Sequence, residues 1–129
     1  RKLDEAKIRS HKLEFLFHKQ KSFPEKELLE NWARIVPRDM KVDKTMLAGY
    51  AVDMKHATGV MWVHLNHVML PGEADERMST LFEYRQKWKL EDLKPYMEHF
   101  RGPGDTLKEV VLRHSREVDG YIVPVATAH

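Results

Sequence analysis

The sequence of 129 residues contains no cysteine, and this absence excludes disulfides, cysteine-based zinc fingers and thiol catalysis. It also lacks an apolar run long enough to span a membrane and a segment that resembles a signal peptide, so no membrane partner is expected. An excess of one charge is missing as well, because 22 lysines and arginines against 20 aspartates and glutamates leave a net charge of +2. This mildly basic balance permits nucleic acid as a partner but does not require it.

Patterns typical of catalysis and metal binding are missing too. The sequence has no glycine-rich phosphate loop after a strand, no nucleophile elbow and no HExxH motif. His64 and His67 are the closest pair among the eight histidines, but in the strand that their neighbours favour they would point to opposite faces. We therefore expect no enzyme, no metal site and no cofactor, and we expect His114 to be a half-buried core residue.

What is present indicates small folded domains. Hydrophobic residues make up 42% of the sequence and charged residues 33%, and the high charge is typical of small domains that leave much of their surface uncovered. The length suits one ordinary domain or two very small ones. The chain opens with Arg1 and not with methionine, so we expect it to be a piece of a longer protein.

The first half begins with two predicted helices. The first has an apolar face at helical spacing, made by Leu13, Leu16 and Phe17. Residues 22–25, Ser-Phe-Pro-Glu, predict a capping box at the start of the second helix, with proline inside its first turn. The apolar stripe of that helix ends at Pro37.

A short third helix and two strands are predicted to complete the first half. Asp43 can cap the helix and Gly49 can end it in a left-handed conformation. The segments Tyr50–Met54 and Val60–Asn66 are typical of strands joined by a turn. The predicted order is therefore helix, helix, helix, strand, strand.

The second half is predicted to repeat this order. Asp75 opens a helix, and Trp88 follows in a short extended piece. Two further helices flank the tight turn at Gly102-Pro103-Gly104, and Thr106 with Glu109 forms a capping box for the second of them. A single strand, Tyr121–Val125, closes the chain.

These elements predict an α+β protein, mainly α, made of two tandem winged-helix domains. Each would be a helix-turn-helix unit with a β wing. We place the first domain at residues 1–70 and the second at 71–129, with Pro71-Gly72 as the break between them.

The last predicted helix carries three cations beside its apolar stripe, Lys108, Arg113 and Arg116. As a recognition helix it would bring them to DNA phosphates, and each neutralised phosphate would release counterions. Basic side chains on an exposed helix are usually just solvated, and Glu109 and Glu117 dilute the charge here. No asparagine or glutamine on this helix can contact adenine edges, so backbone contacts are expected and base-specific recognition is not.

A second basic group surrounds Trp88 and consists of Arg85, Lys87, Lys89 and Lys94. It is either a contact for a macromolecule or a set of lysines that keeps the edge soluble. Trp88 itself is expected to pack in the core of the second domain. The first domain has too little charge near its short third helix for a strong DNA contact, and is more simply a spacer or a protein-contact surface.

An ordered set of segments between about Ser22 and about His114 carries a resemblance to a known family. In chain order the segments are Trp32…Val36-Pro37, Met46-Leu-Ala-Gly-Tyr-Ala-Val52, Leu70-Pro71, Glu76-Arg-Met78…Leu81-Phe82 and Lys87-Trp88…Glu91-Asp-Leu93…Pro95-Tyr-Met97. The set resembles the C-terminal part of the DCC-one family of sister chromatid cohesion proteins. No single segment is diagnostic, but their order is fairly specific.

The resemblance implies a run of winged-helix domains in a subunit of the cohesion-specific alternative replication factor C clamp loader. It implies a nuclear protein of DNA replication and sister chromatid cohesion that contacts DNA, and the missing asparagine and glutamine on the last helix make this contact independent of sequence. It also implies a contact with the catalytic subunit of DNA polymerase epsilon. The remaining clamp-loader subunits are held by the N-terminal part of the family's proteins, which is absent from this sequence. The apolar ending Gly120–Thr127 departs from the basic ending of the family, which argues against a DNA contact at the very end.

Two functions from different classes follow. The first is a non-catalytic module that binds DNA and polymerase. The alternative is a pure protein–protein adaptor without direct DNA contact, which an exposed apolar patch including Tyr121 and Ile122 would favour. A sequence-specific transcription regulator is the weaker third hypothesis because side chains that recognise bases are missing.

Overall fold

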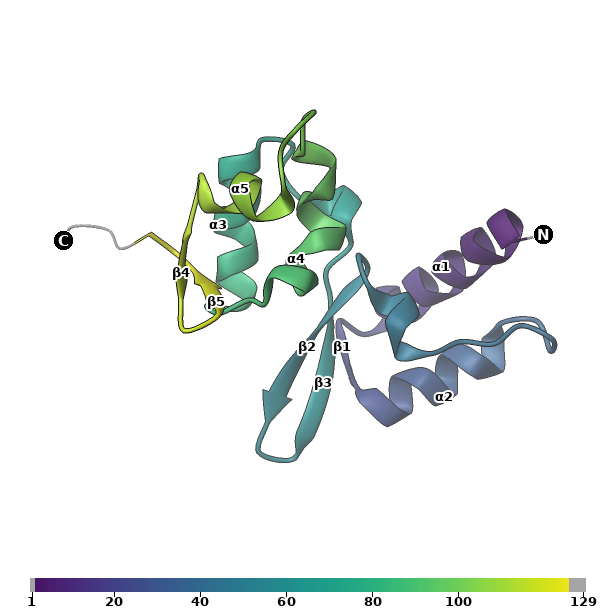
Figure 1. Cartoon of the computed structure of the whole chain (residues 1–129). Helices are drawn as coiled ribbons and strands as arrows, with labels where there is room; N and C mark the ends of the chain where they lie inside the picture. The colour runs from purple at the N-terminus through teal and green to yellow at the C-terminus, as the bar shows by residue number, and fades with distance from the viewer. Residues whose placement is uncertain (1, 126–129) are drawn as a thin grey trace. The chain divides into compact units, whose positions relative to one another are not determined.

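A computed structural model describes residues 2–125 of the chain (Figure 1). Within this range the protein has five α-helices and two small antiparallel sheets, which confirms the predicted α+β class. The chain divides into two compact units, and the boundary along the sequence lies between Asn66 and His67. No helix within residues 2–125 is long and apolar enough to cross a membrane. The end of the apolar segment 120–127, from residue 126 on, lies outside the described residues.

The first unit alternates helices with a three-stranded sheet. Its elements are α1 (Lys2–Lys19), β1 (Ser22–Pro24), α2 (Glu25–Ile35), the 3-10 helix η1 (Lys44–Leu47), β2 (Ala51–His56) and β3 (Gly59–His64). The strands are antiparallel in the order β1-β3-β2. The predicted helices and the predicted hairpin are therefore present, with bounds shifted by a few residues.

The predicted capping box at residues 22–25 is wrong. Ser22–Pro24 form β1, with Ser22 paired to Val63 and Phe23 to Trp62 of β3. Phe23 is only 4% exposed, so burial of its ring together with pairing to β3 stabilises an extended conformation over a helical turn. Helix α2 begins at Glu25 with no side-chain cap.

The core of the first unit lies between its helices and its sheet. Leu13 of α1 and Leu28 and Trp32 of α2 are almost completely buried. The Trp32 indole Nε1 donates a hydrogen bond to the carbonyl of Arg9 at 2.9 Å, which joins α2 to α1. These contacts confirm the predicted apolar faces of both helices.

The short third helix follows its predicted signals, although it is a 3-10 helix. The Asp43 carboxylate caps it by accepting a hydrogen bond from the Thr45 N–H at 2.8 Å. A hydrogen bond from the Thr45 hydroxyl, followed by the one from the Thr45 N–H, lowers the pKa of Asp43. Gly49 follows with a φ of 87°, in the left-handed region that glycine adopts without strain.

The second unit packs its helices against a small hairpin. Its elements are the 3-10 helix η2 (His67–Met69), α3 (Ala74–Tyr84), α4 (Leu90–Met97), the 3-10 helix η3 (Glu98–Phe100), α5 (Leu107–Leu112), β4 (Arg116–Val118) and β5 (Tyr121–Val123). Trp88 forms an antiparallel bridge to Ile122 of β5. Pro95 lies inside α4.

The predicted last helix and last strand are partly wrong. Helix α5 ends at Leu112, so Arg113 and His114 follow it and Arg116 is the first residue of β4. The strand predicted at Tyr121–Val125 ends at Val123 and pairs with β4. Asp119 and Gly120 have φ of 53° and 83°, as in the two-residue turns that suit the twist of a β-hairpin. Formation of this hairpin draws residues 116–118 into a strand.

Apart from the 3-10 helices η2 and η3 of the second unit, both units follow the same order of elements. Each has a helix, a short extended piece, a second helix, a shorter helix and a β-hairpin. In the first unit the extended piece, β1, pairs with the second hairpin strand, β3. In the second unit Trp88 pairs in the same way with β5.

Candidate nucleic-acid interface

The three cations predicted on one recognition helix do not share a helix. Lys108 is on α5, Arg113 caps its C-terminus and Arg116 starts β4. The Lys108 Nζ lies 2.9 Å from Oε1 of Glu117, in a pair that is exposed on both sides. The predicted helical stripe of charge is therefore wrong.

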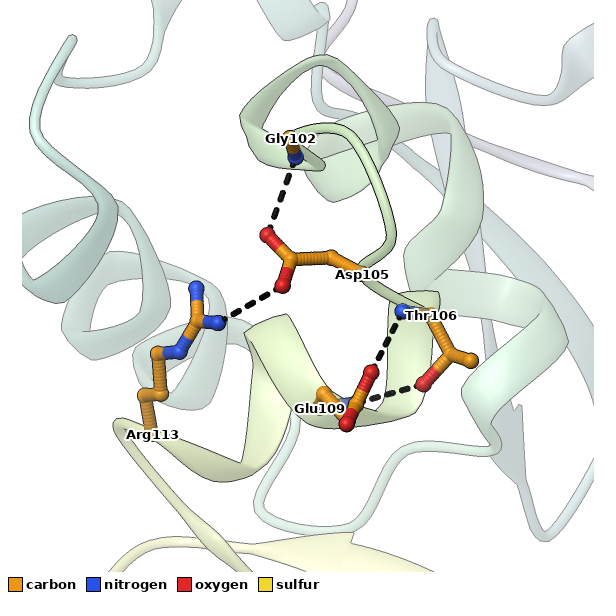
Figure 2. Close-up of polar contacts among 5 residues, drawn as sticks. All are labelled: Gly102, Asp105, Thr106, Glu109 and Arg113. Carbon is orange, nitrogen blue, oxygen red and sulfur yellow. Dashed lines mark hydrogen bonds and ion pairs between the residues drawn. The ribbon is translucent and has the colours of Figure 1, made fainter.

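Arg113 has a structural partner in the turn before α5 (Figure 2). One carboxylate oxygen of Asp105 accepts a hydrogen bond from Arg113 Nη2 at 3.0 Å and the other accepts from the Gly102 N–H at 3.1 Å. The Gly102 N–H, followed by the Arg113 guanidinium, lowers the pKa of Asp105. Thr106 and Glu109 form the predicted capping box beside it, with hydrogen bonds of 3.1 and 2.7 Å.

Arg85 from the second predicted group is also engaged within the unit. Its guanidinium carbon lies 4.6 Å from the ring centroid of Trp88, and its Nη2 lies 3.6 Å from the Asp92 carboxylate. The Trp88 Nε1 donates hydrogen bonds to the carbonyls of Leu81 and Arg85. Trp88 is fully buried, which confirms its predicted place in the core, and Arg85 covers it.

Trp88 extends the β4–β5 hairpin by one extended piece. Its N–H donates to the Ile122 carbonyl at 3.0 Å, and its carbonyl accepts from the Ile122 N–H at 2.7 Å. The side chains of Trp88 and Ile122 are both buried on the inner side. Because side chains alternate across an extended chain, Lys87 and Lys89 point to the outer side.

The register of the hairpin brings further residues to the same outer side. Arg116 pairs with Val123, and Val118 pairs with Tyr121, on either side of the inward Ile122. Residues that are paired across two strands lie on the same face. We call the exposed residues of this outer side the wing face, and they are Lys87, Lys89, Arg116, Val118 and Tyr121.

The cations of the wing face differ from the other predicted cations in their surroundings. Lys87, Lys89 and Arg116 are exposed, and among residues 2–125 none of them forms an ion pair with a carboxylate. Tyr121 is 37% exposed, and the Lys87 Nζ lies 5.6 Å from its ring centroid. Lys94 is also exposed, but it lies on α4 and not in this sheet.

Three unpaired cations around a half-exposed ring suit a polyanion. Each cation can neutralise a phosphate and release counterions, and the ring can stack on an unpaired base. The set contains no asparagine or glutamine to recognise adenine and no acidic side chain to recognise cytosine. The wing face is therefore suited to contacts with a nucleic-acid backbone.

The histidine pair has other roles in the fold. The His64 Nε2 lies 2.8 and 3.0 Å from the two carboxylate oxygens of Glu14, and its ring stacks on Phe17. His67 lies in η2, after the strand. Within the described part of the chain, no three histidine, aspartate or glutamate side chains are grouped so that they could hold a metal ion. His114 is half-buried, as predicted, but outside the helix.

The sequence contains one local signal for the wing face that the prediction of a single closing strand leaves out. Asp-Gly between residues rich in β-branched and aromatic side chains is a strong indicator of a two-residue hairpin. Applied to Asp119-Gly120, it would have predicted β4 and placed Arg116 opposite Val123. Of the two residues considered for an exposed apolar patch, Tyr121 is exposed and Ile122 is buried.

Comparisons with known proteins give a consistent family. The model of the family described as sister chromatid cohesion protein Dcc1 matches residues 1–97. Human sister chromatid cohesion protein DCC1 is 29% identical over 113 residues, which are 88% of this chain and 29% of the human protein. The zebrafish (Danio rerio) protein is 28% identical over 114 residues, which are 88% of this chain and 29% of the zebrafish protein.

A third relative has a similar sequence identity over a shorter stretch. The DCC1 protein of Saccharomyces cerevisiae is 29% identical over 97 residues, which are 74% of this chain and 25% of the yeast protein. The chain thus spans less than a third of the length of the curated relatives that it matches. The resemblance seen in the sequence is confirmed, and the chain belongs to the Dcc1 family of sister chromatid cohesion proteins.

Proposed function

We propose that the chain is a non-catalytic DNA- and polymerase-binding module of a clamp-loader accessory subunit. It acts in DNA replication and sister chromatid cohesion in the nucleus. The relatives are named for sister chromatid cohesion, and the chain corresponds to less than a third of them. The catalytic subunit of DNA polymerase epsilon and, through other parts of the subunit, the remaining clamp-loader proteins are its partners in this proposal.

The observation that carries the DNA contact is the wing face. Lys87, Lys89 and Arg116 are exposed and lack carboxylate partners within residues 2–125. Lys108, Arg113 and Arg85, in contrast, are held by Glu117, Asp105 and Asp92. The wing, and not the helix α5, is then the principal DNA-binding element, with Lys94 as an outlying contact.

The order of elements supports the interpretation as two tandem winged-helix domains. In a winged helix, a helix-turn-helix unit is followed by a hairpin, and the hairpin is the wing. Both units end in such a hairpin, and in both the second hairpin strand pairs with an extended piece that follows the first helix. The hairpin of the second unit, together with the piece around Trp88, carries three exposed cations, whereas Lys55 is the one exposed lysine on the strands of the first hairpin.

Charge reversal on the wing face tests this function. We expect K87E/K89E/R116E to lower affinity for labelled DNA of any sequence by about tenfold or more at low salt, because three phosphate contacts are replaced by repulsion. Fluorescence anisotropy with two duplexes and one single strand of unrelated sequence measures the change. The matched control is K26E/R38E/K55E, which changes the net charge equally at exposed positions of the first unit.

Equal losses in the two triple variants would show that only net charge matters, and would contradict a DNA site on the wing. No loss in either variant would contradict DNA binding by these cations altogether. Circular dichroism of each variant checks that the fold is retained, since all six side chains are exposed.

The alternative function is a protein–protein adaptor. It is favoured by Val118, which is 40% exposed, beside the half-exposed ring of Tyr121 at the centre of the wing face. A pull-down of the chain with the polymerase catalytic domain, with and without primer–template DNA, separates the two functions. Capture without DNA that survives K87E/K89E/R116E supports the adaptor, whereas capture only with DNA supports DNA binding through the wing.

A further inference from the structure

A groove in the first unit is lined by residues that do not belong to the wing face. It is about 320 Å³ in volume and lies between α1 and α2, and every residue that lines it belongs to the first unit. Its apolar part is formed by Leu16 and Phe23, which are buried, together with Phe15 and Ile35. Pockets of this size and composition bind an apolar group through burial.

Phe15 is the most unusual residue of this groove. Its ring is 49% exposed on the surface of α1, although it lies beside the buried Leu16. Exposing a phenyl ring costs free energy that burial against a partner would recover. Lys19 lies over the ring, with its Nζ 4.7 Å from the ring centroid.

The surroundings of the groove are cationic. Residues three and four positions from Phe15 share its side of the helix, and here they are His11, Lys12, His18 and Lys19. Arg34 lines the groove from α2 and donates to the Asn31 side chain. Among residues 2–125, Lys12, Lys19 and Arg34 form no ion pair with a carboxylate. Glu27 is the single acidic residue that lines the groove.

We propose that this groove binds an acidic amphipathic helix of a partner protein. Apolar side chains of the helix insert between Phe15 and Ile35, and its carboxylates face Lys12, Lys19 and Arg34. Such helices bind in hydrophobic grooves through apolar residues spaced at i, i+3 or i+4, and i+7. The contact is independent of the wing face, because the groove and the wing belong to different units.

The lining favours a protein partner over nucleic acid. Three of the four apolar groups are covered or recessed and suit an aliphatic side chain, whereas a polynucleotide needs stacking platforms along a continuous basic path. Nucleic acid in this groove is therefore an outcome that the experiment must be able to detect.

The experiment uses the 129-residue chain and three labelled probes. The first is a helical peptide of about 15 residues with leucine at i, i+4 and i+7 and glutamate on its flanks. The second has lysine at every glutamate position, and the third is a thymidine oligonucleotide. Fluorescence anisotropy measures affinity, and amide chemical-shift changes locate each probe on the protein.

We expect the acidic peptide to bind and to shift amides around Phe15, and the basic peptide to bind at least about tenfold more weakly. F15A should lower affinity for the acidic peptide by about tenfold, as for a central interface residue, whereas F15Y should retain binding. K19Q/R34Q should lower the affinity for the acidic peptide several-fold. Two controls should leave this affinity unchanged: K55Q, at a lysine exposed elsewhere in the same unit, and K87E/K89E/R116E.

Several outcomes would overturn the proposal. These are equal affinity for the two peptides, no binding of the acidic peptide at millimolar concentration, unchanged affinity in F15A, or shifts confined to the second unit. Displacement of the peptide by the oligonucleotide, with shifts around Phe15, would assign the groove to nucleic acid. Because F15A removes a half-exposed ring, its thermal midpoint should stay close to that of the unchanged protein.

Discussion

Single residues decide which of the predicted cations remain available to a ligand. Asp105, Asp92 and Glu117 each lie within 4 Å of one basic side chain of the second unit. Pairs in which at least one side chain is exposed contribute little to stability, but each of them holds its cation beside a carboxylate. Lys87, Lys89 and Arg116 differ because their side chains project from the outer side of a sheet whose inner side holds the buried Trp88 and Ile122.

Asp105 gives a pH-dependent prediction at this scale. The Gly102 N–H and then Arg113 hold its pKa below the ordinary value of 3.8, so the ionised carboxylate stabilises the folded state above that value. This contribution is lost as the pH falls through the lower folded-state pKa. We expect D105N to lower the urea midpoint at pH 7 and to lose this deficit progressively below about pH 4.

Urea unfolding, followed by circular dichroism at pH 7 and at a pH below about 4, measures the effect of D105N. E83Q is the control, because Glu83 is an exposed acid on α3 of the same unit. A deficit in D105N that persists unchanged at low pH would show that the carboxylate charge is not its origin.

Trp88 gives a second prediction, on stability. Its side chain is fully buried and donates two hydrogen bonds to backbone carbonyls. We expect W88A to destabilise the second unit by about 3–5 kcal/mol, the usual cost of truncating a buried large aromatic side chain. Urea unfolding of W88A measures this change, and Q86A, at an exposed neighbouring position, is the control. A fall in the free energy of unfolding of W88A by less than about 1 kcal/mol would contradict the central place of Trp88 in the core.

Among the elements, the hairpin β4–β5 positions the wing face. Its turn needs left-handed backbone at both central residues, Asp119 and Gly120. We expect G120A to destabilise the hairpin by about 1–2 kcal/mol and to weaken DNA binding, because it disturbs the register that places Arg116 on the same face of the sheet as Lys87 and Lys89. Chemical shifts of the β4 and β5 amides, together with anisotropy, measure both effects.

The matched variant for this prediction is G104A. Gly104 also has a positive φ, 81°, and no neighbouring atom within 4 Å of an added Cβ, but it lies in the turn before α5. Equal effects of G104A and G120A on DNA binding would show that loss of stability, and not the wing, explains the result.

The elements also show which parts of the fold could be predicted. Local signals were sufficient for the Thr106 capping box, the Asp43 cap and the apolar faces of α1 and α2. The strand β1 was missed because its stabilisation comes from pairing with residues 61–63 and burial of Phe23, neither of which a local pattern contains. The partners of Arg113 and Lys108 were missed for the same reason, since ion pairs across a turn or between elements depend on the tertiary fold.

For the whole molecule, the division into two units leads to a prediction about folding. Each unit has its own buried side chains, such as Leu28 and Trp32 in the first and Leu93 and Met97 in the second. We expect the fragments 1–66 and 67–129 each to retain the amide spectrum of their half of the chain, with modest stability because domains of about 60 residues bury a smaller share of their surface. An unfolded fragment 67–129 would contradict this, and the boundary predicted after residue 70 would then also fail.

The measurement that tests the central claim most directly is the salt dependence of DNA binding. Log K should fall with log salt by roughly 0.9 per phosphate contacted, so K87E/K89E/R116E should reduce the slope by about two to three, while K26E/R38E/K55E leaves it close to that of the unchanged chain. Equal slopes for the unchanged chain and the wing-face variant would contradict a DNA-binding surface on this wing.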